Sequence, residues 1–220
     1  GYLAMVDDPY DLENPRSLQN ELTVTPDCEG SEALKGMLEA ALTAGLCAAG
    51  ANVTSLGVLP TPAVAYLTGS TTDADAGIVI SASHNPFDDN GIKIFGGAGY
   101  KLTDAQEEQI ERYIDAPPAV QKTGAAMGAV LPFDGDPVET YVRHLADSAP
   151  CRLNGMRIAV DCANGAASTT AEKLFYALGA DAYLINRTPD GVNINENCGS
   201  THIRRLQEVV RGGGFAAELF

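Results

Sequence analysis

The sequence predicts an α/β protein with a largely parallel β-sheet. Stretches in which apolar residues recur at helical spacing alternate with short runs of branched apolar residues, which are typical of buried strands. Residues 157–186 show this order as strand, helix and strand, which is the size of a βαβ unit. The chain has 220 residues, 45% of them hydrophobic and 20% charged, which suits a globular protein with a sizeable core.

The first part of the chain predicts no regular element until Ser31. Residues 1–30 contain three prolines, many acidic residues and little periodicity, so we expect residues 1–35 to form a divergent segment that is irregular or weakly ordered. Apolar residues then follow helical spacing in an alanine-rich context up to Gly50, a natural helix stop. The elements expected next are a strand over 53–59, a helix over 63–68, a buried strand over 77–80, a strand over 91–95, and helices over 104–114 and 137–147.

A second series of elements follows a break at residues 149–155. Its expected members are a strand over 157–162, a helix over 168–178, a strand over 181–186 and a helix over 202–210. The break divides the chain into a first domain over residues 36–150 and a second over residues 151–220. Because the last residues stop where a further strand would begin, we expect the second domain to be truncated and the chain to be a piece of a longer protein.

Charge and hydropathy exclude several classes of partner. Fourteen Lys and Arg against 29 Asp and Glu give a net charge of −15, which argues against nucleic acid or an anionic membrane as a partner. No apolar run reaches the roughly 18–20 residues of a membrane span, and the acidic start does not have the pattern of a signal peptide, so we expect a cytoplasmic protein. The five cysteines form no C-x-x-C pair and are expected to be reduced thiols.

Candidate chemistry gathers in residues 77–95, whose sequence is GIVISASHNPFDDNGIKIF. A buried strand here leads into a polar loop with an Asn-Pro turn, so the Ser83 hydroxyl is presented from the end of a rigid strand. His84 is next to it, and the chain can fold back to bring the ammonium group of Lys93 close. This arrangement would present the serine oxygen to a phosphate group. A polar loop between two strands, without chemistry, accounts for the same residue types equally well.

The complete sequence of residues 77–95 is a more specific signal of function than a lone serine. Together with other stretches of the chain it resembles the α-D-phosphohexomutase superfamily, most closely the bacterial phosphoglucosamine mutases. The matching stretches cover about residues 36–210 in the family's order, and are residues 37–46, 60–67, 77–95, 160–166, 191–195 and 197–202. The resemblance implies a protein of four α/β domains, of which this chain holds the first and most of the second. Each of these two domains is then expected to have three layers around a mixed or parallel sheet.

The resemblance also implies a reaction. Such enzymes move a phosphate between the 6 and 1 positions of a hexose phosphate, here by analogy glucosamine 6-phosphate to glucosamine 1-phosphate, through a bisphosphate intermediate. Ser83 matches the serine that carries the phosphate, His84 flanks it, and Asn90 and Lys93 match the family's Asn-Gly-x-Lys element. Lys93 is expected to activate or steady the transferring oxygen. The family's cofactor is Mg²⁺, held by the phosphoserine, here Ser83, and by three aspartates of an Asp-Gly-Asp-x-Asp-Arg loop.

Several family elements are absent from the sequence. The family normally has a Thr-Asp-Gly-Ile-Arg-Gly strand and an Asp-Thr-Arg-x-Ser-Gly segment before the first helix, and residues 1–35 contain neither. Residues 27–31 lie near the place of the second segment but lack its arginine. The metal loop is absent too, because Asp134-Gly135-Asp136 is followed by Pro137 and is interpreted as a turn that caps the next helix. Polar residues after residue 190 are expected to have structural roles where the family packs its domains together; they are Asn193, Asn195, Ser200, Thr201 and His202.

Other functions are weighed against this one. The main alternative is a truncated or rearranged mutase fragment that folds or interacts without chemistry, and another is a different phosphohexomutase, such as a phosphomannomutase or phosphoglucomutase. A hydrolase using Ser83 and His84 is disfavoured, because neighbouring side chains on a strand point apart and there is no G-x-S-x-G elbow. A nucleotide-binding module is disfavoured too, because residues 163–166 match neither the G-x-G-x-x-G pattern nor the Walker A pattern.

We further hypothesise self-association, since absent domains would leave a surface uncovered. A monomeric mass from light scattering would count against it.

We predict that these 220 residues alone show little or no mutase turnover. Positioning and electrostatic stabilisation carry nearly all of phosphoryl transfer, and the aspartates of the metal loop are not in the sequence. The measurement is an incubation with glucosamine 6-phosphate, Mg²⁺ and a hexose bisphosphate activator. Turnover at an ordinary enzyme rate of about 1–1000 s⁻¹ would contradict the prediction.

Overall fold

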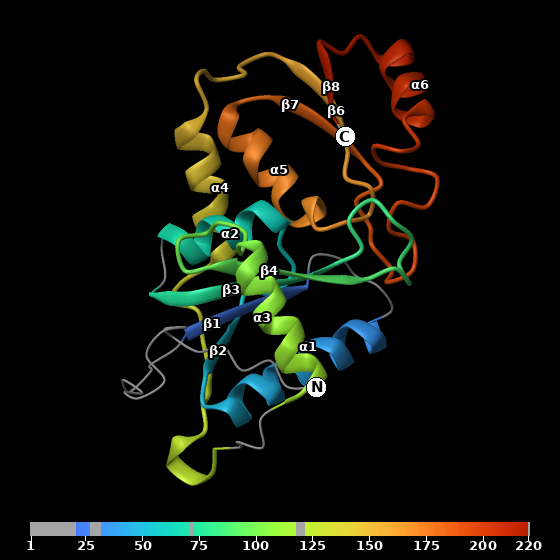
Figure 1. Ribbon diagram of the computed structural model, residues 1–220. Coiled ribbons are helices and arrows are strands. Elements are labelled where there is room, and N and C mark those ends of the chain that lie inside the picture. Colours follow the sequence, from blue (N-terminus) through green and yellow to red (C-terminus); the bar gives the residue numbers. More distant parts are fainter. Residues whose placement is uncertain (1–20, 27–31, 71–72, 118–121, 220) are drawn as a thin grey trace.

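A computed structural model describes residues 21–26, 32–70, 73–117 and 122–219, which form two sheets with helices around them (Figure 1). The first sheet has the order β4-β3-β1-β2-β5 and the second the order β7-β6-β8. All neighbouring strands are parallel except the antiparallel pair β3 and β4. The strands are β1 (Glu21–Pro26), β2 (Asn52–Ser55), β3 (Ala74–Ser81), β4 (Gly91–Gly96), β5 (Val130–Leu131), β6 (Arg157–Asp161), β7 (Asp181–Ile185) and β8 (Ala217–Leu219).

The helices lie close to the predicted ranges, which confirms the mixed α/β fold class. They are α1 (Glu32–Ala49), α2 (Thr61–Ser70), α3 (Asp104–Asp115), α4 (Pro137–Ser148), α5 (Ala167–Leu178) and α6 (Arg204–Gly213), with a short 3₁₀ turn over Gly124–Ala126. Asp136 caps α4 as predicted, since its side chain accepts hydrogen bonds from the backbone N–H groups of Val138 and Glu139. None of the helices in the described ranges is long and apolar enough to cross a membrane.

The prediction of an irregular start was wrong for residues 21–26. They form β1, which pairs with β2 on one side and β3 on the other, in the middle of the first sheet (Figure 1). The sequence Glu-Leu-Thr-Val-Thr-Pro alternates polar and apolar residues with β-branched members, a strand pattern that the surrounding prolines and acids obscured. Residues 1–20 and 27–31, to which the rest of that prediction applies, lie outside the described residues.

Two further expectations on the first half of the chain are corrected. The strand expected over residues 53–59 ends at Ser55, because Gly57 adopts a left-handed backbone with φ 70° that an extended strand does not continue through. The loop that follows still buries Leu56 and Leu59 completely or nearly so. Met37 is one of the apolar residues at helical spacing in α1, and that spacing predicts a core position for it, but it is 67% exposed.

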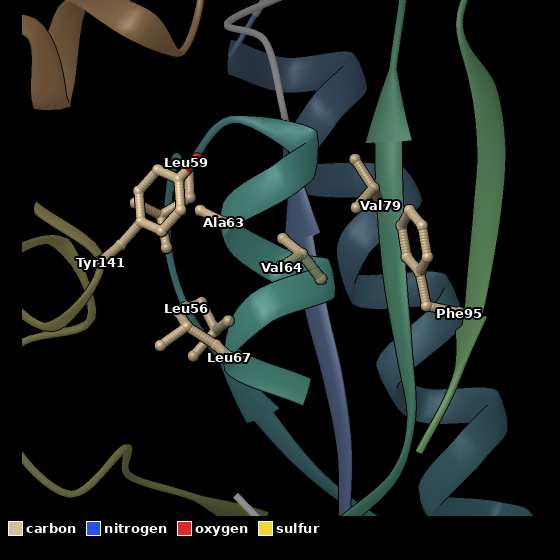
Figure 2. Packing of buried hydrophobic residues seen from close by; sticks show 8 residues of the cluster. All are labelled: Leu56, Leu59, Ala63, Val64, Leu67, Val79, Phe95 and Tyr141. Carbon is tan, nitrogen blue, oxygen red and sulfur yellow. The ribbon is translucent and has the colours of Figure 1, made fainter. Parts of the chain in front are cut away.

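Strand β3 is the centre of the first core, because residues on its two faces pack against different helices. Ile78 packs on the side of α1 with Leu46 and Val53, whereas Val79 packs on the other side with Val64 of α2. Figure 2 shows the α2 side, where Phe95 of β4 and Tyr141 of α4 complete the cluster. The first sheet therefore has helices on both faces, which is a three-layer arrangement.

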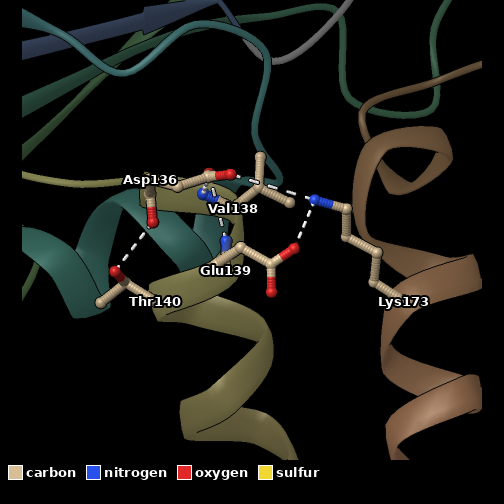
Figure 3. A network of polar contacts seen from close by, with 5 residues as sticks. All are labelled: Asp136, Val138, Glu139, Thr140 and Lys173. Atoms are coloured by element: carbon tan, nitrogen blue, oxygen red, sulfur yellow. Dashed lines mark hydrogen bonds and ion pairs between the residues drawn. The ribbon is translucent and has the colours of Figure 1, made fainter.

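The second sheet is covered in the same way. Ile158 and Val160 of β6 pack with Phe175 of α5, while Ala159 between them packs with Leu206 of α6. Helix α4 connects the two sheets. It contributes Tyr141 to the first core, and its N-terminus meets α5 where Lys173 Nζ lies 2.6 Å from Glu139 Oε1 and 4.0 Å from Asp136 Oδ2 (Figure 3).

The close approach of α2 to β3 depends on Gly77, and we predict that Gly77→Ala destabilises the fold. An added Cβ would lie 2.1 Å from Thr68 Oγ1, and Thr68 is fully buried, so helix and strand must separate. Overpacking of this kind costs about 1–3 kcal/mol of unfolding free energy, to be measured by urea denaturation. Gly36→Ala is the matched control: it has open space within α1 and should gain about 1 kcal/mol from helix propensity. Equal stability of the two variants would contradict the packing argument.

Candidate active site

The loop between β3 and β4 is held in shape by hydrogen bonds among its own residues. The ladder of the two strands ends at the pair Ser81 and Gly91. Beyond it the Asn85 N–H donates to Ala82 O at 3.0 Å, and the Asn90 side-chain amide donates to Phe87 O at 2.8 Å. Asn90, one of the predicted site residues, therefore has a structural role in this loop. The loop is a fixed platform that begins directly at the end of a buried strand.

Ser83 is exposed on this platform and has a left-handed backbone, with φ 58°. That conformation is unfavourable for a residue other than glycine by about 1–2 kcal/mol, so other contacts must hold it. Its N–H donates to Ser81 Oγ at 2.9 Å, and its C=O accepts a hydrogen bond from Asn195 Nδ2 at 3.0 Å. The backbone of Ser83 is thus tied down on both sides, while its side chain lies at the surface.

Lys93 lies near Ser83 as predicted, with Ser81 between them. Lys93 is half-buried on β4, opposite Val79, and its Nζ lies 3.4 Å from Ser81 Oγ. Ser81 is 3% exposed and so joins the ammonium group of Lys93 to the backbone N–H of Ser83. Sequence reasoning missed Ser81, which is the last residue of β3 and lies two residues before Ser83.

His84 is exposed beside Ser83, and in the described part of the chain no hydrogen bond joins its ring to the Ser83 hydroxyl. Of the four predicted residues, Ser83 and Lys93 are joined through Ser81, while the Asn90 side chain is bound within the loop. This arrangement does not favour a hydrolase in which His84 activates Ser83, because that mechanism needs the two groups within hydrogen-bond reach.

The second sheet contributes one wall of the site. A cavity of about 260 Å³ lies beside Ser83, between the start of α2 and the start of α5. Its lining comes from both parts of the chain, and consists of residues 60–62, Ser81, Ser83, residues 162–163, residues 165–167, Ile194 and Asn195. Ile194 is buried against Ala82 and the half-buried Phe87, so the loop after residue 190 packs directly on the serine loop.

A buried carboxylate holds this wall together. Asp161, at the end of β6, is 4% exposed and accepts hydrogen bonds from the Ala163 N–H at 2.9 Å, the Gly199 N–H at 2.9 Å and Asn186 Nδ2 at 2.8 Å. A buried charge is tolerated only when such donors replace water. Asp161 therefore ties the loop between β6 and α5 to the loop between β7 and α6, which carries Asn195. In the sequence, only the position of an acidic residue at a strand end points to this role.

The cysteines of this wall are unreactive by environment. Cys162 and Cys198 are buried, and burial together with the nearby Asp161 charge raises the pKa of each thiol to about 11. All four cysteines in the described ranges are free, as expected from their spacing. Cys151, by contrast, is exposed.

A metal site cannot be assembled from the described residues alone. They contain no group of three or more His, Cys, Asp or Glu side chains placed to hold an ion. Asp136 is occupied as the cap of α4, as predicted, and Asp88 and Asp89 are exposed in the serine loop. The Mg²⁺ expected from the resemblance therefore has Ser83 as a single candidate ligand here.

Comparisons with known proteins agree with this geometry. Residues 33–121 match the family model for phosphoglucomutase/phosphomannomutase, alpha/beta/alpha domain I. The chain is 51% identical over 174 residues to a phosphoglucosamine mutase of Mycolicibacterium vanbaalenii, covering 79% of the chain and 39% of the relative. It is 54% identical over 180 residues to a phosphoglucosamine mutase of Deinococcus deserti, covering 81% and 40%. The chain thus spans about two fifths of the length of these curated relatives.

Solved structures show the same fold. A phosphoglucomutase/phosphomannomutase family protein from Burkholderia thailandensis superposes with a TM-score of 0.70 at 28% identity, covering 88% of this chain and 41% of that one. The open form of the phosphoglucomutase pp63/parafusin from Paramecium gives a TM-score of 0.61 at 16% identity, over 88% and 40% of the two chains. At that lower identity the likeness concerns the fold alone.

We predict that thiol labelling separates the cysteines by burial. In a Cys28→Ser background at pH 8, Cys151 should react quickly with iodoacetamide while Cys162 and Cys198 stay unlabelled. Their raised pKa leaves only about a thousandth of each thiol as thiolate at pH 8, and that fraction grows only as the pH nears 11. Peptide mass spectrometry reads the outcome, with urea-unfolded chain as the control in which all sites react. Native labelling of Cys162 at the rate of Cys151 would contradict the described burial.

Proposed function

Because the chain belongs to the phosphohexomutase family, we propose that it carries the phosphate-accepting serine of a phosphoglucosamine mutase. The reaction moves a phosphate between glucosamine 6-phosphate and glucosamine 1-phosphate through a sugar bisphosphate. The relatives at about 50% identity bear this name, and they support the choice of substrate class. Since the chain covers about two fifths of their length, the complete activity needs groups beyond these residues.

The observation that carries the proposal is the presentation of Ser83. Its hydroxyl lies exposed at the end of a buried strand, on a backbone that hydrogen bonds hold on both sides. A nucleophile for phosphoryl transfer must be accessible and fixed in place, because positioning supplies much of the rate. A loop without chemistry has no comparable need for a constrained serine with a left-handed backbone.

The proposed step transfers a phosphoryl group to Ser83. The bond between phosphorus and a sugar oxygen of a hexose bisphosphate breaks as a bond from phosphorus to Ser83 Oγ forms, and the serine proton ends on the departing sugar oxygen. Lys93 is linked to this serine through the hydroxyl of Ser81. Its positive charge would stabilise the negative charge that develops on the transferring oxygens.

Phosphohexomutases are metal-dependent enzymes, and a phosphorylated Ser83 would offer oxygens to a divalent cation. The described residues do not supply the carboxylates that would complete such a site. We therefore propose Ser83 as one metal ligand, with the remaining ligands supplied from outside the described residues. In this proposal, Lys93 and the loop around Ser83 bind and orient the phosphate wherever the remaining metal ligands lie.

We predict that Ser83 is the residue that accepts phosphate from a hexose 1,6-bisphosphate. Intact-mass spectrometry should show one slowly added phosphoryl group on the chain, and Ser83→Ala should abolish it. Ser148→Ala, which removes another exposed serine, is the control that should leave it unchanged. Phosphorylation that persists in Ser83→Ala, or its absence from the unaltered chain, would overturn the proposal. Glucose and mannose bisphosphates, offered beside the glucosamine compound, compare the candidate substrates.

Lys93→Met should lower the rate of this phosphorylation by about 10²-fold, because the transferring oxygens lose a stabilising charge. Lys101→Met, which removes an exposed lysine just after the same hairpin, is the matched control and should have little effect. The measurement is the initial rate by intact mass at a fixed bisphosphate concentration. Equal rates for the two variants would exclude a role for Lys93 in transfer.

A further inference from the structure

We propose, on the basis of the function proposed above, that Asn195 is a positioning residue for the nucleophile. It is supplied by the second sheet's side of the structure, yet it binds the serine loop of the first. The Asn195 side-chain amide donates to Ser83 O at 3.0 Å and to Asn85 O at 2.8 Å. Both of its amide hydrogens are therefore used on two carbonyls of one loop, one on each side of His84.

The serine loop needs this contact because Ser83 has an unfavourable backbone conformation. Of its two backbone groups, the N–H is held by Ser81 from within the first sheet, and the C=O is held by Asn195. If Asn195 is removed, the C=O of Ser83 loses this partner, and the left-handed residue can relax toward an ordinary conformation. Such a change would rotate the serine side chain away from its present direction.

Asn195 is itself held rigidly, which is what a positioning residue requires. Its own N–H donates to Ala163 O at 2.9 Å, and Gly199 four residues later donates to the buried Asp161 at 2.9 Å. The preceding residue, Ile194, is buried against Ala82. Hydrogen bonds and apolar packing thus fix Asn195 from both sides.

The expected effect is on the rate of transfer rather than on the binding of the phosphate donor. The Asn195 amide uses both hydrogens on backbone carbonyls, so its side chain has no donor left for the phosphate groups of the donor sugar. Misplacing a nucleophile by about 1 Å can cost on the order of 10²-fold in rate. Loss of Asn195 should therefore lower the maximal rate of Ser83 phosphorylation and leave the half-saturating donor concentration unchanged.

The test compares Asn195→Asp and Asn195→Ala with Asn197→Asp. Asn197 is the matched control because it is exposed, lies in the same loop and also has a positive φ of 53°. Asn195→Asp preserves the size of the side chain but removes its donors. Two measurements are made on each chain: hydrogen exchange of the backbone amides over residues 82–90, and the rate of Ser83 phosphorylation across hexose 1,6-bisphosphate concentrations. Urea denaturation confirms that each variant is folded.

We expect both Asn195 variants to exchange about 10-fold faster in the serine loop and to show a maximal rate lowered by about 10-fold or more, with unchanged half-saturation in Asn195→Ala, which adds no charge to the cavity. Asn197→Asp should match the unaltered chain in both. Unchanged exchange in the Asn195 variants overturns the inference, as does a normal maximal rate. Faster exchange together with an unaltered chain that takes up no phosphate supports the positioning role and overturns the proposed function instead.

Discussion

A carboxylate buried at the end of a strand must find hydrogen-bond donors, and this need organises the face of the molecule around Ser83. Asp161 takes its donors from two loops, one after β6 and one after β7, and the second of them carries Asn195. Burying such a charge without partners would cost several kcal/mol, so the loops are held to the geometry that supplies them. The arrangement of the serine therefore depends on an acidic group that lies on a different sheet.

Helix α4 shows which forces hold the two sheets together. The ion pair between Lys173 and Glu139 is short, and the hydrogen bond to Glu139 raises the pKa of Lys173, but both side chains are about half exposed. Exposed pairs of this kind contribute little to stability, because water screens them. Burial of Tyr141 in the first core, next to the stacked rings of Tyr66 and His144, removes far more apolar surface from water. Apolar packing therefore decides the position of α4, and the ion pair adjusts it.

The sequence predicted the parts of the fold that local pattern determines. Helices with clear apolar periodicity and the mostly buried β3 were predicted within a few residues of their bounds. The approach of Lys93 to Ser83 followed from a strand pair joined by one loop. Strand β1 was missed because its neighbours in the sequence, rich in proline and acids, masked a short alternating pattern. Ser81 and Asn195 acquire their roles only through contacts: Asn195 meets Ser83 across 112 positions of the chain, and no local spacing records that. Its expected structural role is confirmed by those two hydrogen bonds.

The position of β1 has a consequence for how the chain assembles. Its partners on either side, β2 and β3, follow it by about 30 and 50 residues, so β1 must wait for both to be synthesised before the centre of the sheet can close. Every pairing around β1 is parallel and requires a helix or long crossover between the strands. A shortened gene that starts at the first clear helix would therefore remove the middle of the sheet and leave two exposed edges open to aggregation.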